Sequence, residues 1–151
     1  MNQQQIAGQY RQHSAQGVNR VGLVVRLYDA IIEDLRRALE ALRAGDVERR
    51  TAAVNHALLI LAELESVLDH RQGGQVARHL EGFYRVTRAM IVEANGRASA
   101  AQMERLMGLF LPVRQAWQQA EQDFALQEHR ASARAAFAPG DADGEPSRWS
   151  V

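Results

Sequence analysis

The stretch that decides the fold of this chain is RLYDAIIEDLRRALEALRAGD, residues 26–46. Its larger apolar residues recur at alternating steps of three and four, the spacing that brings side chains onto one face of an α-helix. Charged residues occupy the opposite side, where Glu33 and Arg37 lie one turn apart and support the helix. Gly45 supplies a stop, and Asp46 can cap a following helix. The predicted core face is Val24, Tyr28, Ile31, Leu35, Ala38 and Leu42.

The same period continues along the chain, and no segment alternates polar and apolar residues as a half-buried β-strand would. Asn19 is a candidate N-cap for the first helix, and Ser99 is one for the last. We expect helices over residues 20–44, 47–70, 75–95 and 99–126, with turns at Gly45, Gly73–Gly74 and Asn95–Gly96.

The core faces of the later helices follow from the same spacing. Pro112 falls inside the last helix, where its missing N–H predicts a kink between about Gly108 and Pro112. The predicted faces are Val47, Thr51, Val54, Leu58, Leu61, Leu64 and Leu68, then Val76, Leu80, Phe83, Thr87, Met90 and Ala94, and finally Met103, Leu106, Phe110, Val113, Trp117, Ala120 and Phe124.

Four helices joined by short connections favour an all-α fold, an antiparallel up-down four-helix bundle. Residues 1–18 are polar and rich in Gln, and we expect a flexible N-terminal arm. The bundle is predicted over residues 19–126. Residues 127–151 include the run APGDADGEPSRWSV, whose Pro, Gly and Asp content predicts a disordered C-terminal tail.

The composition argues against several function classes. The 151 residues carry 18 basic and 18 acidic side chains, and this neutral balance does not favour nucleic-acid binding. Every basic residue is an arginine and cysteine is absent, so lysine, thiolate and disulfide chemistry are excluded. No apolar run reaches the length of a membrane span, and the N-terminus lacks the apolar core of a signal peptide. We therefore expect a cytoplasmic protein that does not insert into membranes.

Candidate catalytic and metal-binding residues are few. No Glu is followed three residues later by His, the pair that di-iron bundles use, so we expect no metal or other cofactor. Asp29 and Glu33 lie one turn apart, and we interpret them as a solvated face with arginine partners. Arg50 and His56, in RTAAVNH, resemble the Arg–His signature of HEPN-type ribonucleases. A ribonuclease using these two residues is a minor alternative, and otherwise we expect no enzyme and no catalytic residue.

The helices carry more apolar residues than a small bundle core requires. A core-facing helix needs about three apolar positions per heptad, and these helices locally exceed that number. The surplus can complete a generous core, form a homodimer, or line a groove that receives an amphipathic segment of a partner. The surplus positions on the first three helices include Leu23, Leu27, Leu59, Ile60, Tyr84 and Ile91.

An ordered set of motifs over roughly residues 9–122 resembles the flagellar export chaperone family FliS. The longest is QYRQHSAQGVNRVGLVVRLYDAIIEDLRRALEALRAGDVE, followed by NHALLILAELESVLD, QGGQVARHLEGFYRVTRAMIVEAN and VRQAWQQA. The landmarks are Tyr10, the LYD run within Leu23 to Ile32, Ala38 to Asp46, Leu64 to Asp69, Gly73–Gly74, Ala94–Asn95 and Trp117.

The resemblance implies a non-enzymatic role in the cytoplasm. Members of the family bind the C-terminal segment of flagellin in hydrophobic grooves, prevent its premature polymerisation and present it to a component of the flagellar export gate. By this resemblance Tyr10 anchors an N-terminal arm over part of the groove. The expected partner-binding residues are Tyr10, Leu23, Leu27, Leu59, Ile60, Tyr84 and Ile91, and the remaining alternative is a helical dimerisation or adaptor module.

Overall fold

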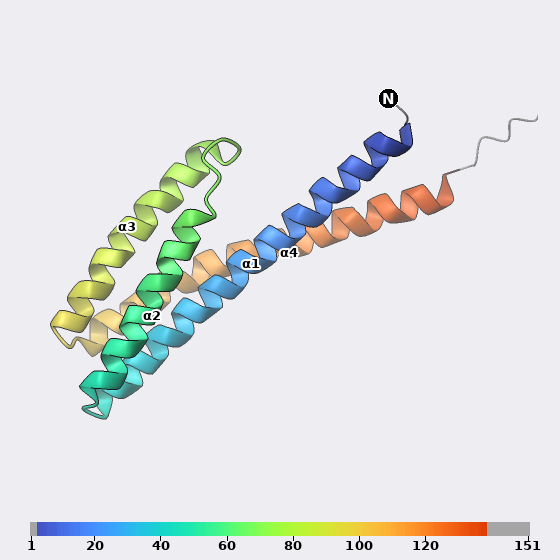
Figure 1. The fold of residues 1–151 in the computed structure, drawn as a ribbon. Helices are drawn as coiled ribbons and strands as arrows, with labels where there is room; N and C mark the ends of the chain where they lie inside the picture. The colour runs from blue at the N-terminus through green and yellow to red at the C-terminus, as the bar shows by residue number, and fades with distance from the viewer. Residues whose placement is uncertain (1–2, 139–151) are drawn as a thin grey trace, which may run out of the picture.

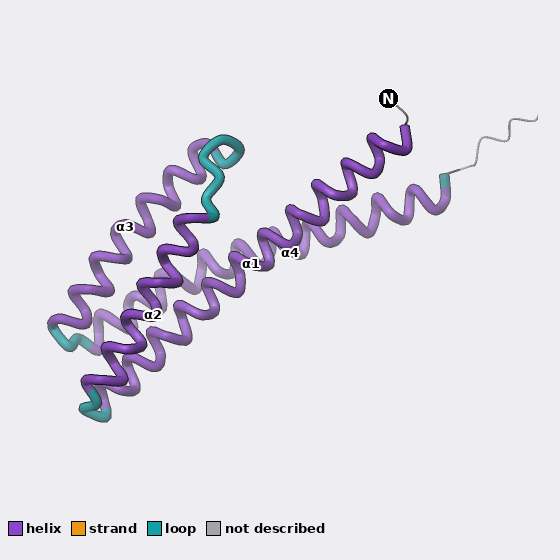
Figure 2. The backbone as a smooth tube through the Cα atoms, viewed as in Figure 1, coloured by secondary structure: helices purple, strands orange, loops and turns teal. Residues whose placement is uncertain are grey.

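Residues 3–138 form four helices, and no strand occurs among them. The computed structural model describes the backbone of residues 3–138 and the side chains of residues 3–5 and 20–138. Consecutive helices run back along one another and are joined by short loops (Figures 1 and 2). The predicted all-α class is confirmed. The helices are α1 (Gln3–Arg43), α2 (Val47–Ser66), α3 (Gly74–Gly96) and α4 (Ala100–Phe137).

Two of the helix boundaries are set by the capping residues that the sequence predicts. The Asp46 carboxylate accepts a hydrogen bond from the Arg49 backbone N–H at 3.1 Å, and Gly45 before it has a φ of 70°. The Ser99 hydroxyl likewise accepts from the backbone N–H of Gln102 at 3.2 Å. These side chains satisfy N–H groups that the first turn of a helix leaves unpaired.

The predicted start of the first helix is wrong, because α1 begins at Gln3 rather than near Arg20. Asn19 therefore lies inside α1 and is not its N-cap. Residues 1–18 were expected to form an arm, but from Gln3 onward their backbone is helical. The segment is rich in Gln, a good helix former that needs no apolar face. Farther along, Gly22 allows close approach to α4, since a Cβ there would lie 3.2 Å from a carboxylate oxygen of Glu121.

Two other predicted ends are also wrong. Helix α2 stops at Ser66 instead of His70, because Asp69 draws the chain into a turn by accepting the backbone N–H groups of Arg71 and Gln72. Helix α4 continues past Leu126 to Phe137, and its last turns are rich in alanine, the strongest helix former. The helix is continuous through Pro112, and the kink expected there stays a prediction. Residues 139–151 of the predicted tail lie outside the described residues.

The turn after α3 also differs in detail from the expectation. The left-handed residue is Ala98, with a φ of 49°, and Asn95 and Gly96 still belong to the helix. The Ser99 N–H then donates to the Ala94 carbonyl at 3.0 Å, which satisfies one of the last acceptors of α3. The sequence therefore indicates the turn but not the residue that makes it.

The core lies between all four helices. Helix α1 packs along α2 and α4, and α3 packs on the other side of the same pair. The predicted face of α1 is largely correct: Val24, Tyr28, Ile31, Leu35 and Ala38 are buried. The other large buried side chains come from α2, α3 and α4 and are Leu61, Leu64, Tyr84, Ile91, Met103, Leu106 and Phe110.

The predicted core face of α3 is displaced by about one position. Val76 is 64% exposed, whereas Tyr84 and Ile91, which we expected at the surface, are each 1% exposed. Both sets share Thr87 and Ala94, and both fall within the wide stripe that a core-facing helix buries, so periodicity alone does not separate them.

What separates them is a polar pair at the centre of the core. The hydroxyl groups of Tyr28 on α1 and Tyr84 on α3 lie 2.8 Å apart and form a buried hydrogen bond (either can be the donor). The Tyr28 ring also meets Phe110 of α4 edge-on at 6.0 Å between ring centres. This arrangement satisfies both hydroxyls in the interior and fixes which side of α3 faces α1.

Burial changes the acidity of both tyrosines. Desolvation raises the pKa of Tyr84, and the neighbouring Tyr28 raises it further. Desolvation also raises the pKa of Tyr28, while hydrogen bonds to Tyr84 and Trp117 lower it in part. Both phenols are therefore held neutral in the fold.

The buried tyrosine pair predicts an asymmetric effect of removing each hydroxyl. Tyr28→Phe leaves Tyr84 without its partner and is expected to lower the free energy of unfolding by about 1–3 kcal/mol. Tyr84→Phe is expected to cost less, because Tyr28 keeps its hydrogen bond to Trp117. The double Phe variant should recover part of the loss. Urea unfolding of the unmodified protein, the two single variants and the double variant forms a double-mutant cycle. If the loss in the double variant equals the sum of the two single losses, the hydroxyl groups do not interact.

Alkaline pH provides an independent check on the same pair. A phenol whose pKa is raised on folding stabilises the protein below its unfolded pKa, near 10, and that contribution is lost as the pH rises further. We expect the unfolding free energy to fall above about pH 10, by up to about 1.4 kcal/mol per pH unit for each tyrosine. Since the chain has no lysine or cysteine, few other groups titrate there. In the double Phe variant the unfolding free energy should depend much less on pH above about pH 10. If it falls as steeply as in the unmodified protein, the two tyrosines are not the cause.

Candidate functional site

At one end of the fold, α1 and α4 continue past the loop that joins α2 and α3 (Figure 1). An apolar groove lies at this end. It has a volume of about 360 Å³, and side chains from all four helices and from the α2–α3 loop line it. We call it the Trp117 groove. Its apolar lining includes Val21 and Val24 of α1, Leu64 of α2, Val67 and Leu68 of the loop, Val76, Leu80 and Tyr84 of α3, and Trp117 and Phe124 of α4.

The Trp117 groove combines a rigid floor with accessible apolar walls. Tyr84 belongs to the core, and partly buried Trp117 lies beside it. Val76, Val67 and Phe124 are exposed. Such a surface can bury aliphatic or aromatic side chains of a partner, each worth about 1.5–3 kcal/mol. The arrangement suits binding of an apolar segment rather than chemistry.

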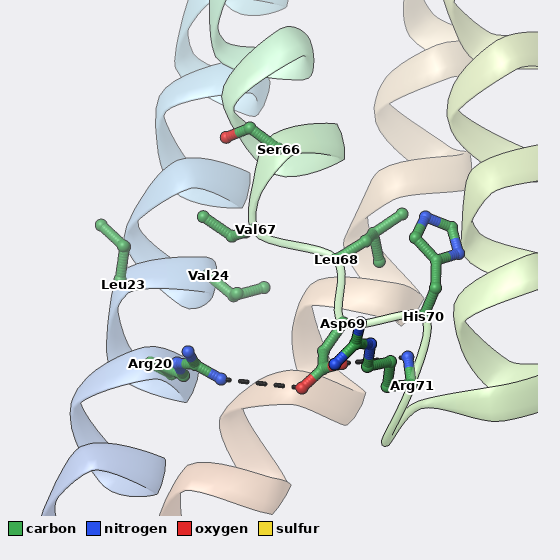
Figure 3. Close-up of a pocket in the computed structure, with 9 residues that line it drawn as sticks. All are labelled: Arg20, Leu23, Val24, Ser66, Val67, Leu68, Asp69, His70 and Arg71. Carbon is green, nitrogen blue, oxygen red and sulfur yellow. Dashed lines mark hydrogen bonds and ion pairs between the residues drawn. The ribbon is translucent and has the colours of Figure 1, made fainter.

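A second groove of about 510 Å³ lies on the other side of the same loop, and we call it the loop-side groove (Figure 3). Leu23 and Val24 of α1 and Val67 and Leu68 of the loop line it, and Figure 3 shows Val24 and Val67 between α1 and the loop. The two grooves share Val24, Val67 and Leu68, so they border one continuous apolar region at this end of the bundle.

The rim shared by the two grooves is polar. Arg20 of α1 and Asp69 of the loop form an ion pair at 3.9 Å between nitrogen and oxygen (Figure 3). The pKa of Asp69 is lowered, first by the hydrogen bond from the Gln72 backbone N–H and also by Arg20. The Arg20 side chain is 74% exposed, so the pair contributes little stability and both charges remain accessible to a partner.

The structure separates the residues predicted to bind a partner. Leu23 is 39% exposed and lines the loop-side groove, and Leu59 is 66% exposed on α2 but lines neither groove. Leu27 and Ile60 are half-buried and pack against the core. Tyr84 forms the floor of the Trp117 groove, but at 1% exposure it is a core residue, as is Ile91. Placing those two on the surface was wrong, while the side chain of Tyr10 lies outside the described residues.

Several groove residues were assigned to the core by sequence reasoning. Val76, Leu80 and Phe124 continue the apolar period of their helices, and nothing in that period shows that the facing helix has ended. Trp117 was likewise predicted on the core face of its helix, besides being a landmark of the family resemblance. One signal was available, because apolar Val67 and Leu68 stand directly beside the turn-forming Asp69 and Gly73–Gly74.

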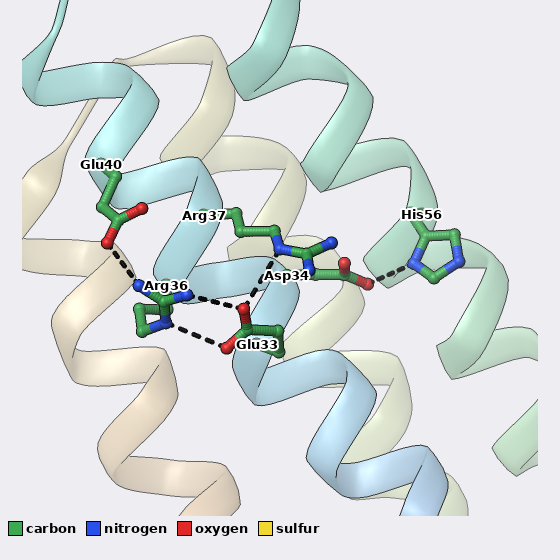
Figure 4. A network of polar contacts seen from close by, with 6 residues as sticks. All are labelled: Glu33, Asp34, Arg36, Arg37, Glu40 and His56. Atoms are coloured by element: carbon green, nitrogen blue, oxygen red, sulfur yellow. Dashed lines mark hydrogen bonds and ion pairs between the residues drawn. The ribbon is translucent and has the colours of Figure 1, made fainter.

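The polar network on α1 gives no sign of an active site (Figure 4). Glu33 pairs with Arg36 at 2.6 Å and with Arg37 at 3.1 Å, and Arg36 also pairs with Glu40. The pKa of Glu33 is lowered, chiefly by the hydrogen bond from Arg36. Asp29 pairs with Arg114 of α4 at 2.6 Å. The predicted arginine partners of Asp29 and Glu33 are thus confirmed.

Arg50 and His56 do not converge on a common point. The Arg50 guanidinium donates to the Asn95 side chain of α3 at 3.0 Å. His56 Nδ1 lies 2.6 Å from the carboxylate of Asp34 on α1, as Figure 4 shows. The two side chains therefore reach toward different neighbouring helices. Asp34 is 4% exposed, although it is charged.

Among the described residues, no group of three or more His, Asp or Glu side chains could hold a metal ion. Within the same part of the chain, no helix is long and apolar enough to cross a membrane.

Gly73 shapes the loop beside the Trp117 groove, and its replacement gives a test. A Cβ at this position would lie 2.6 Å from the Asp69 carbonyl oxygen and 2.9 Å from the Ala77 Cβ. Gly73→Ala must move the loop, and we expect it to lower the midpoint of thermal unfolding. Gly82→Ala is the control, because its Cβ meets nothing within 4 Å and an alanine inside α3 should stabilise the helix by about 0.5–1 kcal/mol. Circular dichroism melting compares the two, and an unchanged Gly73→Ala midpoint would contradict the close approach.

Comparison with known proteins identifies the family. The model of the family described as "Flagellar protein FliS" matches residues 2–123. A "Flagellar secretion chaperone FliS" of Salmonella typhimurium is 31% identical over 109 residues, 72% of this chain and 81% of that protein. One of Campylobacter jejuni is 28% identical over 73% of this chain and 86% of its own length. A "Flagellar secretion chaperone FliSB" of Pseudomonas aeruginosa is 26% identical over 72% of this chain and 90% of its own. The family predicted from the sequence motifs is thereby confirmed: the chain belongs to the FliS family of flagellar proteins.

Proposed function

We propose that this protein is a cytoplasmic export chaperone that binds the C-terminal segment of flagellin. In this role it holds the segment apart from other flagellin chains, prevents premature polymerisation and delivers it to a component of the flagellar export gate. Membership of a family whose relatives are named flagellar secretion chaperones supports the export role. The observation that carries client binding is the Trp117 groove, an apolar surface to which all four helices contribute.

The groove suits an amphipathic segment better than a small polar ligand. Val76, Val67 and Phe124 offer exposed apolar contacts, while Arg20 and Asp69 on the rim offer one charge of each sign. A helix bound in an apolar groove buries side chains spaced three and four apart, and its polar side stays in water. Two or three such side chains contribute about 3–9 kcal/mol of gross apolar burial, which offsets the free-energy cost of association.

We propose no catalytic role. The only enzymatic alternative suggested by the sequence requires Arg50 and His56 to act at one phosphate, and their hydrogen bonds to Asn95 and Asp34 direct them to different helices. The dimerisation or adaptor alternative predicts self-association through the exposed apolar residues, and the binding experiment below separates it from a chaperone.

Val76 and Val92 provide a matched pair for this experiment. Both valines lie on α3 and are 64% and 55% exposed, but only Val76 lines the Trp117 groove. Val76→Asp should weaken binding of the flagellin C-terminal segment about 10- to 100-fold, because it removes an apolar contact and places a charge against the client. Val92→Asp should change the Kd less than about threefold. Isothermal titration calorimetry measures both.

Size-exclusion chromatography of the unmodified protein completes the experiment. A one-to-one complex with the flagellin segment is expected. Absence of a complex, or equal losses for the two variants, would contradict the proposed site. Concentration-dependent dimers that dissociate in Val76→Asp would instead support the dimerisation alternative.

A further inference from the structure

The buried tyrosine pair carries one more proton than its own hydrogen bond uses. Tyr28 and Tyr84 bring two O–H groups to the 2.8 Å contact between their oxygens, and that contact uses one of them. Glu65 of α2 acts on Tyr84 through its charge, but its carboxylate pairs with Arg88 at 2.9 Å. Among the described residues, no other group accepts a hydrogen bond from either hydroxyl. Each oxygen has a partner, and one O–H donor is left over.

The spare donor lies on Tyr84. An indole has only an N–H to give, so the hydrogen bond between Trp117 and Tyr28 makes the Tyr28 oxygen an acceptor. Tyr28 is 0% exposed and lines neither groove, so a spare proton on it would be enclosed in the core without an acceptor, at a high desolvation cost. The favoured order runs from the Trp117 indole to the Tyr28 oxygen, and from the Tyr28 hydroxyl to the Tyr84 oxygen. The O–H of Tyr84 then remains available.

This available hydroxyl lies beside the Trp117 groove. Its oxygen is 2.8 Å from the Tyr28 oxygen, which is within hydrogen-bond reach of the Trp117 indole. Tyr84 and Trp117 both line the groove, so the hydroxyl is at the bottom of the groove rather than deep in the core. Leu64 and Leu80, from α2 and α3, add apolar side chains to the same lining. The floor of the groove thus combines apolar surface with a single O–H donor.

Such a donor restricts what can fill the groove. While the groove is open, water can accept the hydrogen bond. An apolar side chain placed over the hydroxyl would expel that water and leave a buried donor unpaired. A carboxylate would lose its hydration for one neutral donor, which compensates it poorly. An uncharged oxygen restores the bond, and in a bound helix it must come from a side chain, because the backbone carbonyls are already paired within the helix.

We propose that Tyr84 is a specificity-determining residue of the Trp117 groove. Its O–H donates a hydrogen bond to one uncharged side-chain oxygen, of Asn, Gln, Ser or Thr, on the otherwise apolar face of the flagellin segment. The groove thereby favours a segment that carries one such residue over a helix with a purely apolar face. The identity of the occupant rests on the proposed function, whereas the donor rests on the geometry of the tyrosine pair.

Two phenylalanine variants separate recognition from stability. Tyr84→Phe removes the donor and should weaken binding of the flagellin C-terminal segment about 5- to 100-fold. Tyr28→Phe keeps the donor and should change the Kd less than about threefold, although it is the variant expected to lose more stability. Isothermal titration calorimetry and urea unfolding give the two orders. If Tyr28→Phe binds worse than Tyr84→Phe, the role of Tyr84 is structural and the proposal is overturned. Unchanged affinity in Tyr84→Phe overturns it as well.

A scan of the flagellin segment locates the partner oxygen. Each Asn, Gln, Ser and Thr of the segment is replaced in turn by Leu, Met, Ala or Val, respectively. One replacement should weaken binding to the unmodified protein about 5- to 100-fold and have little effect on binding to Tyr84→Phe, because both changes remove the same bond. If every replacement has the same effect on both proteins, Tyr84 bonds to none of these residues and the proposal fails.

Two small molecules test the donor without flagellin. Acetophenone and α-methylstyrene have nearly the same shape and differ by a carbonyl oxygen in place of a methylene group. Their binding to the full chain is followed by the indole N–H signal of Trp117 in a ¹H–¹⁵N spectrum, assigned by its loss in Trp117→Phe. In Tyr84→Phe the ratio of the two Kd values should shift at least about fivefold in favour of α-methylstyrene, and in Tyr28→Phe it should stay constant. An unchanged ratio in Tyr84→Phe, or no response to either molecule, contradicts the proposal.

These outcomes distinguish the two proposals. If the ratio for the small molecules depends on Tyr84 but the flagellin segment does not bind, the donor is confirmed and the proposed function fails. If the flagellin segment binds equally well to Tyr84→Phe, the proposed function stands and Tyr84 does not determine its specificity.

Discussion

The hydrogen bond between the Tyr28 and Tyr84 hydroxyls links the core of this bundle to its surface. Its two oxygens are buried and 2.8 Å apart, so neither tyrosine can turn away without leaving a polar group unsatisfied. Tyr84 is thereby held toward α1, and the rotation of α3 about its axis is fixed with it. That rotation exposes Val76 two turns earlier and places it on the wall of the Trp117 groove. The same tyrosine closes the groove from below, so core packing and binding surface share a residue.

The sequence predicted the helical class and most of the turns, because these depend on local chemistry. Asp46 and Ser99 cap their helices as expected, and the α1 face through Tyr28, Ile31 and Leu35 is buried. Helix ends beyond the core were predicted less well. Where α1 and α4 extend past the other helices, they need no continuous apolar stripe, so periodicity gave no sign of residues 3–18 or 127–137 as helix.

The candidate binding surface was predicted only in part, for a geometric reason. A groove at the end of a bundle is lined by residues that continue a core face after the opposing helix has stopped. In the sequence pattern, Val76, Leu80 and Phe124 therefore cannot be distinguished from core residues. Conversely, Tyr84 and Ile91 looked like surplus because the buried stripe of α3 was placed one position away. The length of α2 relative to its neighbours resolves the first error, and that length depends on the turn made by Asp69. The buried hydroxyl pair of Tyr28 and Tyr84 resolves the second.

The joining of four helices at a single groove has a thermodynamic consequence. Any ligand that fills the Trp117 groove touches elements from both ends of the chain, so it binds only when the whole bundle is assembled. Occupancy is then linked to folding, and a ligand at about one hundred times its Kd adds about 2.7 kcal/mol to the free energy of unfolding. A ligand in the groove contacts both the α1–α4 pair and the α2–α3 pair, so it stabilises their packing against each other. A protein of this design is most resistant to proteolysis while a ligand fills the groove, and least resistant while the groove is empty.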